Sequence, residues 1–290
     1  MILTAETNKI MEKKMSKMSN LSTRIIVALF AIPLIIILSI VGKIPFLFFV
    51  FFIGLVSFFE FSNILKKRRF YTNQVLGGLS VFAIILNSYL QFIEIEFLFL
   101  IVVLILLLAE LFRHKESEIA NLGASLIGIF YIGFFSSSLV RLREFYRDTL
   151  FNYDQGGYLI ISILASIWIC DSAAYFIGSA FGRHKMYPRI SPNKSWEGAA
   201  AGFVFSVLAM IIAKEIFLNL ISMGNAIVIG IIIGIFGQAG DFVESMIKRD
   251  ANVKDSSSLI PGHGGIFDRF DSLIFSAPLI YIYMYYFAQF

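Results

Sequence analysis

The sequence predicts an all-α protein that crosses a membrane several times. Hydrophobic residues make up 58% of the 290-residue chain and charged residues 15%, and the mean hydropathy is +0.81, which is typical of a membrane protein. Because hydrocarbon offers no partners for backbone N–H and C=O groups, the spanning elements must be helices or a closed barrel. The apolar runs are long and do not alternate with period two, so they favour helices.

Nine apolar segments approach the length of about 20 residues that a helix needs to cross the hydrocarbon core. In chain order we expect transmembrane helices near 25–41, 44–65, 75–92, 95–112, 119–139, 158–178, 198–218, 226–247 and 270–287. The third and seventh are the weakest of the nine, because polar residues such as Asn87 and Lys214 lie within them. The sequence therefore predicts about nine transmembrane helices.

Basic residues near the helix ends predict how the chain is oriented, because cytoplasmic loops carry an excess of lysine and arginine. With nine spans, one side of the membrane receives Lys9, Lys13, Lys14, Lys17, Arg24, Lys66, Lys67, Arg68, Arg69, Arg113 and Lys115. We therefore expect a cytoplasmic N-terminus and an outside C-terminus. Arg141, Arg143 and Arg147 fall on the far side and are the exception to this pattern.

The sequence predicts one membrane domain preceded by a polar N-terminal segment. No small-residue cleavage site follows the first apolar run, so this run is expected to be a retained helix and not a signal peptide. Residues 1–22 are expected to form a mobile cytoplasmic segment, and 23–290 a single integral-membrane domain. Cys170 is the single cysteine, which excludes an intramolecular disulfide and a multi-cysteine metal site.

Polar residues concentrate in the part of the chain from 171 to 272, in two stretches. In the first, Asp171, Tyr175 and Gly178 are spaced to share one face of the sixth helix. The loop that follows carries Ser191, Lys194 and Ser195 just before the seventh helix. A polar loop that leads into a helix N-terminus suits an anion such as phosphate, although an ordinary basic loop with a helix cap explains the same residues.

In the second stretch, Asp241, Ser245 and Lys248 form one stripe along the end of the eighth helix. Asp241 lies deeper in the membrane than Lys248, and a carboxylate at that depth requires a counter-charge. A metal ion, a substrate or a basic side chain could supply it. A structural ion pair with a neighbouring arginine is the alternative without function.

A glycine-rich turn and a group of acids follow this helix. The turn contains His263, Gly264 and Gly265, and its backbone N–H groups could approach an anion closely. Asp268 and Asp271 lie on neighbouring positions of the ninth helix, and clustered carboxylates suit a hard cation such as Mg²⁺. The helix dipole alone accounts for one acid in a first turn. A lone histidine does not indicate zinc.

The residues of the second stretch resemble the signature of the phosphatidate cytidylyltransferase family. The resemblance rests on Ser245, Lys248, Arg249, Lys254, Asp255 and the run Ile-Pro-Gly-His-Gly-Gly-Ile-Phe-Asp-Arg-Phe-Asp over 260–271, and the segment 191–198 is also similar. Two positions depart from the family pattern. Ser179 stands where many members carry lysine or arginine, and Ala201 stands where glycine is usual. The first five helices carry no motif.

The resemblance implies a membrane enzyme that joins CTP to phosphatidic acid, giving CDP-diacylglycerol and pyrophosphate. It implies that Asp241 and Asp268 hold Mg²⁺, with Asp271 as an outer carboxylate and a second cation left open. The catalytic set would be Asp241, Asp268, Lys248, Arg249 and Arg269, and substrate would be bound by Ser191, Lys194, Ser195, Lys254, Asp255, His263, Gly264 and Gly265.

The expected partners are CTP, phosphatidic acid and the lipid bilayer of the cell membrane, with the active site facing the cytoplasm and no nucleic acid. A homodimer is left open, because Gly230, Gly234 and Gly237 permit close helix packing. One alternative is an ion-coupled transporter in which Asp171, Asp241 and Asp268 carry protons or cations through the bundle. A second alternative is a CTP-using enzyme that acts on a different lipid.

Overall fold

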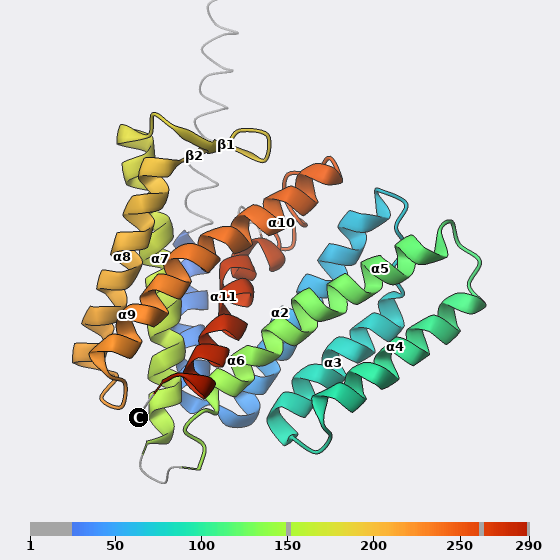
Figure 1. The fold of residues 1–290 in the computed structure, drawn as a ribbon, viewed down its shortest axis with the longest axis horizontal. Coiled ribbons are helices and arrows are strands. Elements are labelled where there is room, and N and C mark those ends of the chain that lie inside the picture. Colours follow the sequence, from blue (N-terminus) through green and yellow to red (C-terminus); the bar gives the residue numbers. More distant parts are fainter. Residues whose placement is uncertain (1–24, 149–151, 261–263, 289–290) are drawn as a thin grey trace, which may run out of the picture.

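The computed structural model describes residues 25–148, 152–260 and 264–288, and helices dominate this part of the chain (Figure 1). The helical elements are Ile25–Val41, α2 (Lys43–Lys66), α3 (Gln74–Leu90), α4 (Ile95–Leu111), α5 (Glu118–Gly128), η1 (Ile129–Phe134), α6 (Phe135–Arg143), α7 (Tyr153–Phe181), α8 (Trp196–Ile216), α9 (Met223–Ile232), η2 (Ile233–Gly237), α10 (Gln238–Asp250) and α11 (Phe267–Tyr286). Strands β1 (Lys185–Tyr187) and β2 (Ser191–Ser195) form one short antiparallel hairpin.

The all-α prediction is confirmed. The elements α5, η1 and α6 follow one another without a break, as do α9, η2 and α10, so the described residues form nine continuous helices. Each matches one of the nine predicted segments, with ends that differ by a few residues. The predicted mobile segment 1–22 lies outside the described residues.

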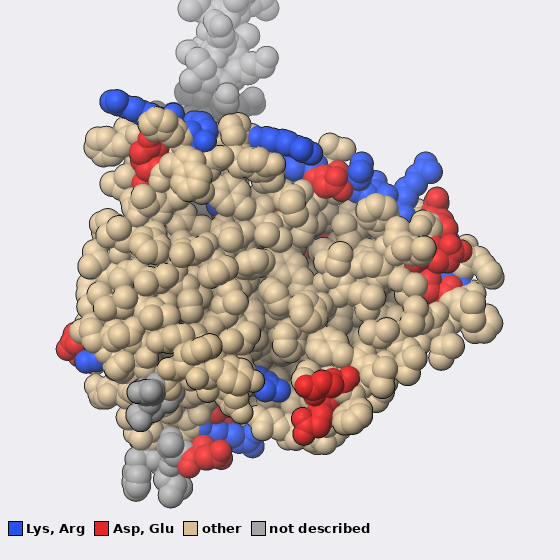
Figure 2. Space-filling view, in the orientation of Figure 1, with Lys and Arg blue, Asp and Glu red and all other residues tan. Residues whose placement is uncertain are grey.

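The apolar helices identify a multi-pass membrane protein. Five continuous helices are long and apolar enough to cross a membrane by length and composition, namely Lys43–Lys66, Glu118–Arg143, Tyr153–Phe181, Trp196–Ile216 and Met223–Asp250. Ile25–Val41 and Gln74–Leu90 are shorter apolar helices. Figure 2 shows charged side chains gathered toward two opposite ends of the molecule, with a broad uncharged belt between them on the face shown.

Small polar residues begin several of the helices, as side-chain capping of free backbone N–H groups requires. The Ser117 and Ser222 hydroxyls accept hydrogen bonds from backbone N–H groups three residues later, at the starts of α5 and α9. The N-terminus of α11 is different, because its N-cap residue Ile266 makes no capping hydrogen bond with its side chain. The donors at the start of α11 therefore need a partner from elsewhere in the chain.

A π-helical segment, η2, joins α9 to α10 directly before the site-bearing residues. Gly230 in α9 and Gly234 in η2 pack against α8, and a Cβ added at Gly230 would lie 2.6 Å from the Val207 Cα. A Cβ at Gly234 would lie 2.5 Å from the Ser206 Oγ. The small size of these two glycines thus serves helix contacts within the chain, which accounts for them without a second copy.

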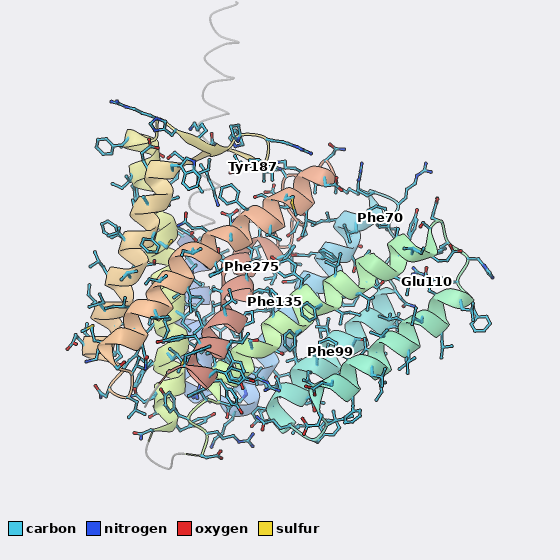
Figure 3. The ribbon with its side chains drawn as sticks, in the orientation of Figure 1. Phe70, Phe99, Glu110, Phe135, Tyr187 and Phe275 are labelled. Carbon is cyan, nitrogen blue, oxygen red and sulfur yellow. The ribbon has the colours of Figure 1, made fainter. Side chains whose placement is uncertain are left out.

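Aromatic side chains join the N-terminal helices to α11. The ring centroids of Phe135 on α6 and Phe275 on α11 lie 5.9 Å apart, and both side chains are labelled in Figure 3. Tyr131 in η1 lies 5.9 Å from both Phe267 and Phe275 of α11. The helices without a sequence motif therefore pack directly against the helix that carries Asp268 and Asp271.

The three arginines that break the charge pattern are engaged in contacts at one end of the bundle. Arg143 is fully buried and donates hydrogen bonds to the carbonyl oxygens of Ser39 and Ile40, near the end of the first described helix. Those carbonyls lie in the last turn of a helix, where no intrahelical donor remains. Arg141 donates to the Tyr281 hydroxyl and Arg147 to a backbone carbonyl oxygen. These contacts give the arginines a structural role independent of membrane orientation.

Candidate active site

A cavity of about 830 Å³ lies between α7, the β1–β2 hairpin, α8, α10 and the start of α11. Figure 1 shows these elements meeting toward the upper end of the molecule. Six acidic and four basic side chains line the cavity: Asp171, Asp241, Glu244, Asp255, Asp268, Asp271, Lys185, Lys194, Lys248 and Arg269. The excess of acids suits a cation, whereas the bases suit an anion. The cavity can therefore hold a cation and a phosphate group together.

One wall of the cavity comes from α7 and the start of α8. Asp171, Tyr175 and Gly178 all line it, as their helical spacing predicted. Gly198 lies against α7 so closely that a Cβ there would come within 2.6 Å of the Ala174 carbonyl oxygen. The Ser195 hydroxyl caps α8 by accepting a hydrogen bond from the Gly198 N–H at 3.2 Å. This close approach places the β1–β2 hairpin beside the cavity.

Lys194 supplies the counter-charge that the depth of Asp241 requires. Its Nζ lies 2.6 Å from the Asp241 Oδ2, and it also lies 4.3 Å from the centre of the Phe242 ring. The ion pair joins β2 to α10, so the two polar stretches of the sequence meet at this point. This partner is a lysine that lines the cavity. Ser191 begins β2 but does not line the cavity.

Three carboxylates form a compact group in the cavity. Asp241, Glu244 and Asp271 each offer an oxygen, and these atoms all lie within 4.8 Å of one another. Glu244 is 1% exposed, and its Oε1 has no hydrogen-bond donor among the described residues. Like charges held this close raise the free energy of the folded chain unless a cation or a proton offsets them. An oxygen-only set of this kind fits Mg²⁺.

Asp268 is bound differently from these three acids. Its carboxylate accepts hydrogen bonds from Lys248 Nζ at 2.7 Å and from the backbone N–H groups of Ser256 and Gly265 at 2.9 and 2.8 Å. Lys248 also pairs with Glu244 at 2.6 Å. Protein donors thus surround Asp268, and Lys248 connects it to the group of three acids. In this structure Asp268 fixes the connection between α10 and α11.

The other residues singled out in the sequence are divided between the cavity and the surface. Arg269 and Asp255 line the cavity. Arg249 is exposed and donates to the Val253 carbonyl oxygen at 2.8 Å, and Lys254 is also exposed. Neither side chain lines the cavity. His263 lies outside the described residues.

Gly264 and Gly265 show why the turn before α11 needs glycine. Gly264 has a φ of +83°, in the left-handed region that L side chains rarely adopt. A Cβ added at Gly265 would lie only 2.0 Å from the Ser256 Oγ and 2.4 Å from an oxygen of Glu60. No side chain fits at Gly265 without displacing the turn that binds Asp268.

Comparison with known sequences identifies the family of this chain. The family model described as "Cytidylyltransferase family" matches residues 22–287, nearly the whole chain. The chain belongs to this family. A phosphatidate cytidylyltransferase of Brucella suis is 33% identical over 272 residues, which cover 94% of this chain and 96% of that protein. The Bacillus subtilis phosphatidate cytidylyltransferase is 33% identical over 235 residues, covering 79% of this chain and 84% of the relative. A third such protein, from Haemophilus influenzae, is 41% identical over 161 residues, about half of each chain.

Within this member of the cytidylyltransferase family, sequence reasoning missed three residues that the structure places at or beside the cavity. Glu244 follows Asp241 by three positions, a spacing that puts both on one helix face and could have identified it. Gln238 donates hydrogen bonds to carbonyl oxygens of α8 and η2, which ties α10 to its neighbours. Glu60 comes from α2, where it is a lone acid in an apolar helix. An ionisable residue in such a helix is itself a signal of function.

Proposed function

We propose that this protein transfers the cytidylyl group of CTP to phosphatidic acid and so makes CDP-diacylglycerol. The observation that carries this proposal is a cavity in which a group of three acids lies beside Lys194 and Arg269, in a bundle of membrane-length helices. A water-soluble nucleotide and the headgroup of a membrane lipid can both reach such a place. Membership of the cytidylyltransferase family and the names of the relatives support the same reaction.

The reaction needs the lipid phosphate to be held in line with the α-phosphorus of CTP. An oxygen of the lipid phosphate forms a bond to that phosphorus while the bond between the α-phosphorus and the bridging oxygen breaks, and pyrophosphate leaves. The attacking oxygen is already anionic at neutral pH, so the reaction does not require a strong general base. Lys194 and Arg269 would hold phosphate oxygens and balance their charge. Lys248 would keep Glu244 and Asp268 in place through its two ion pairs.

Asp241, Glu244 and Asp271 would hold a divalent cation, with Mg²⁺ as the ion that their oxygens suit best. When bound, the cation supplies charge neutralisation for the triphosphate. The unpartnered Oε1 of Glu244 is the observation that supports this fit. Asp268 is proposed to act by positioning, because its oxygens already accept hydrogen bonds from three donor groups of the turn and from Lys248.

We also propose that the cavity faces the cytoplasm. It lies at the same end of the bundle as the basic residues after α2 and α4, which the excess of positive charge in cytoplasmic loops assigns to that side. Protease access to the β1–β2 hairpin, or thiol labelling of a cysteine introduced into it, in sealed vesicles of known orientation measures this directly. Labelling from the outside alone would contradict the assignment.

An apolar groove beside the cavity is proposed to hold part of an acyl chain of the lipid. The groove is about 290 Å³ and is lined by Met186, Tyr187, Ile190, Trp196, Phe242, Val243 and Met246. Met186 lines the cavity as well, so the two spaces are adjacent. Tyr187 lies at the edge of the molecule in Figure 3, and tyrosine and tryptophan are enriched where protein meets the membrane interface.

Met246→Gln keeps the length of the side chain but makes the groove polar. We expect the KM for long-chain phosphatidate to rise roughly tenfold, the scale of one lost apolar side-chain contact, with the KM for CTP unchanged. Met223→Gln, at the start of α9, is the matched control and should change neither constant. An unchanged KM for phosphatidate, or an equal rise for both substrates, would show that the acyl chain lies elsewhere.

The reaction itself is tested with purified protein in detergent, given labelled CTP, phosphatidic acid and Mg²⁺. We expect CDP-diacylglycerol and pyrophosphate in equal amounts, with no product when the metal is chelated. Absence of product from the folded wild-type protein would overturn the proposal. Product from another phosphorylated lipid but not from phosphatidic acid would instead support the alternative of a different lipid substrate.

The transporter alternative finds less support in the arrangement of the acids. Asp171, Asp241 and Asp268 all line the same cavity. They do not follow a path from one end of the bundle to the other. Ion flux into proteoliposomes in the absence of nucleotide would nevertheless favour a transporter, so this measurement belongs beside the enzyme assay.

A further inference from the structure

Glu60 is a buried acid of α2 whose partners all lie near the C-terminal end of the chain. It is 5% exposed. Its carboxylate accepts hydrogen bonds from the Ser256 hydroxyl at 3.0 Å, from the Ser257 hydroxyl, and from the backbone N–H groups of Ile266 and Phe267 at 3.1 and 2.8 Å. These four donors come from the connection between α10 and α11 and from the first residue of α11. A burial this complete requires such partners, since an unsatisfied carboxylate would be costly.

This carboxylate acts as the N-terminal cap of α11. The first N–H groups of a helix have no partner within the helix, and α11 has no capping side chain of its own. Glu60 accepts from the N–H groups at this end, where the helix dipole also favours a negative charge. The start of α11, which carries Asp268, is therefore held in place by a residue of the second helix.

A chain of polar contacts connects Glu60 with the acids of the cavity. The Ser256 Oγ lies 3.0 Å from an oxygen of Glu60 and 3.0 Å from an oxygen of Asp268. Asp268 binds Lys248, and Lys248 binds Glu244 of the three-acid group. A displacement of Glu60 would thus move the donors that orient Asp268. Because Lys248 pairs with both Asp268 and Glu244, the position of Glu244 would change as well.

Gly265 shows how tightly this arrangement is packed. The space that its side chain would occupy is filled by the Ser256 hydroxyl and by both carboxylate oxygens of Glu60, at 2.0, 2.4 and 2.5 Å from the added Cβ. The backbone N–H of the same glycine donates to Asp268 at 2.8 Å. The carboxylate of Glu60 therefore packs against Gly265 on the side where a side chain would lie, while the Gly265 N–H donates to Asp268.

We propose that Glu60 is a positioning residue for the reaction: it holds Ser256, Ser257 and the start of α11 in place and so orients Asp268 and Lys248 toward the three-acid group. The proposal rests on the proposed cytidylyl transfer. It gives the second helix, which carries no motif of the family signature, a direct part in the site. Glu60 is not among the residues that line the cavity.

The test compares Glu60→Gln with the matched variant Glu110→Gln in the purified protein. Glu110 is also a buried acid of the N-terminal half, at 4% exposed, and it bonds Asn121 and Arg113. None of these three residues lines the cavity. Glutamine keeps the size of the side chain but weakens its hydrogen bonds to N–H and O–H donors. We expect Glu60→Gln to lower kcat by on the order of tenfold or more, the scale seen for partners that orient metal ligands, and to raise the Mg²⁺ concentration needed for half-maximal rate.

Glu110→Gln should lower the melting temperature to a similar extent but leave kcat and the Mg²⁺ dependence of the folded protein unchanged. If Glu60→Gln does not fold, Ser257→Ala removes one of the four donors, and we expect a smaller change of the same kind. Wild-type activity with an unaltered kcat and Mg²⁺ dependence in the folded Glu60→Gln or Ser257→Ala protein would overturn the role of Glu60. Lack of activity in the wild type would instead overturn the proposed function.

Discussion

Replacing Asp271 with asparagine is expected to lower the rate of CDP-diacylglycerol formation by about 10³-fold, the scale on which phosphoryl transfer responds to the loss of one charge-stabilising group. Asp271 is 7% exposed, and it offers one of the three carboxylate oxygens that lie within 4.8 Å of one another. Asparagine keeps its size but removes its charge, so the site should bind a divalent cation less tightly. The initial rate is measured against Mg²⁺ concentration, and both the maximal rate and the half-saturation point are read.

The same titration separates two assignments of the metal ligands. If Asp241, Glu244 and Asp271 hold the cation, Glu244→Gln should raise the half-saturating Mg²⁺ concentration as Asp271→Asn does. Asp268→Asn should then lower the rate with a smaller change in this concentration, because Asp268 orients the turn. A large shift in Asp268→Asn with none in Glu244→Gln would restore the ligand set that the family resemblance implies.

Lys194→Met is expected to reduce kcat/KM for CTP by about 10²-fold, near the lower end of the loss that follows removal of one preorganised charge donor. The Lys194 Nζ lies 2.6 Å from Asp241 at the edge of the cavity, and its side chain is 29% exposed, so an entering phosphate can reach it. The variant also leaves Asp241 without its basic partner. The rates are measured over a range of CTP concentrations at saturating phosphatidic acid.

Lys214→Met is the matched control for this variant. Lys214 lies in the last turn of α8, where it pairs with Glu215, and it does not line the cavity. Its replacement should leave kcat/KM for CTP unchanged. Equal activity of Lys194→Met and the wild type would remove Lys194 from the phosphate-binding residues and leave its ion pair as a purely structural contact.

The helices could be predicted from the sequence because the signals for them are local. Long apolar runs mark each helix, and residues such as Ser117 and Ser222 begin them through contacts only three positions away. The orientation in the membrane rests on loop charges alone and stays a prediction. Arg143 illustrates the limit of counting charges, because it is buried against carbonyl oxygens about 100 residues away and is not a free loop cation.

The site could be predicted in part, since its residues lie in two polar stretches that stand out from the apolar helices. The meeting of Lys194 with Asp241 depends on how α8 and α10 pack, which no local pattern contains. The resemblance implied Asp268 as a metal ligand and Asp271 as an outer carboxylate, yet the turn donates hydrogen bonds to Asp268, and Asp271 lies in the three-acid group. Glu60 has no local signal beyond its charge, because its partners lie about 200 residues later.

The π-helical segment η2 determines the direction in which the acids of α10 face. Successive residues of an α-helix are turned by about 100° around its axis, so one residue more or fewer between Ile233 and Gly237 would rotate everything that follows by that angle. Gly230 before the segment and Gly234 within it face α8, and Asp241 and Glu244 after it face the cavity. The wide turn sets the angular phase between the packing face and the acidic face. A helical wheel that treats residues 233–237 as regular α-helix would place Asp241 and Glu244 on the wrong face. An insertion or deletion within this segment would turn the two acids away from the cavity.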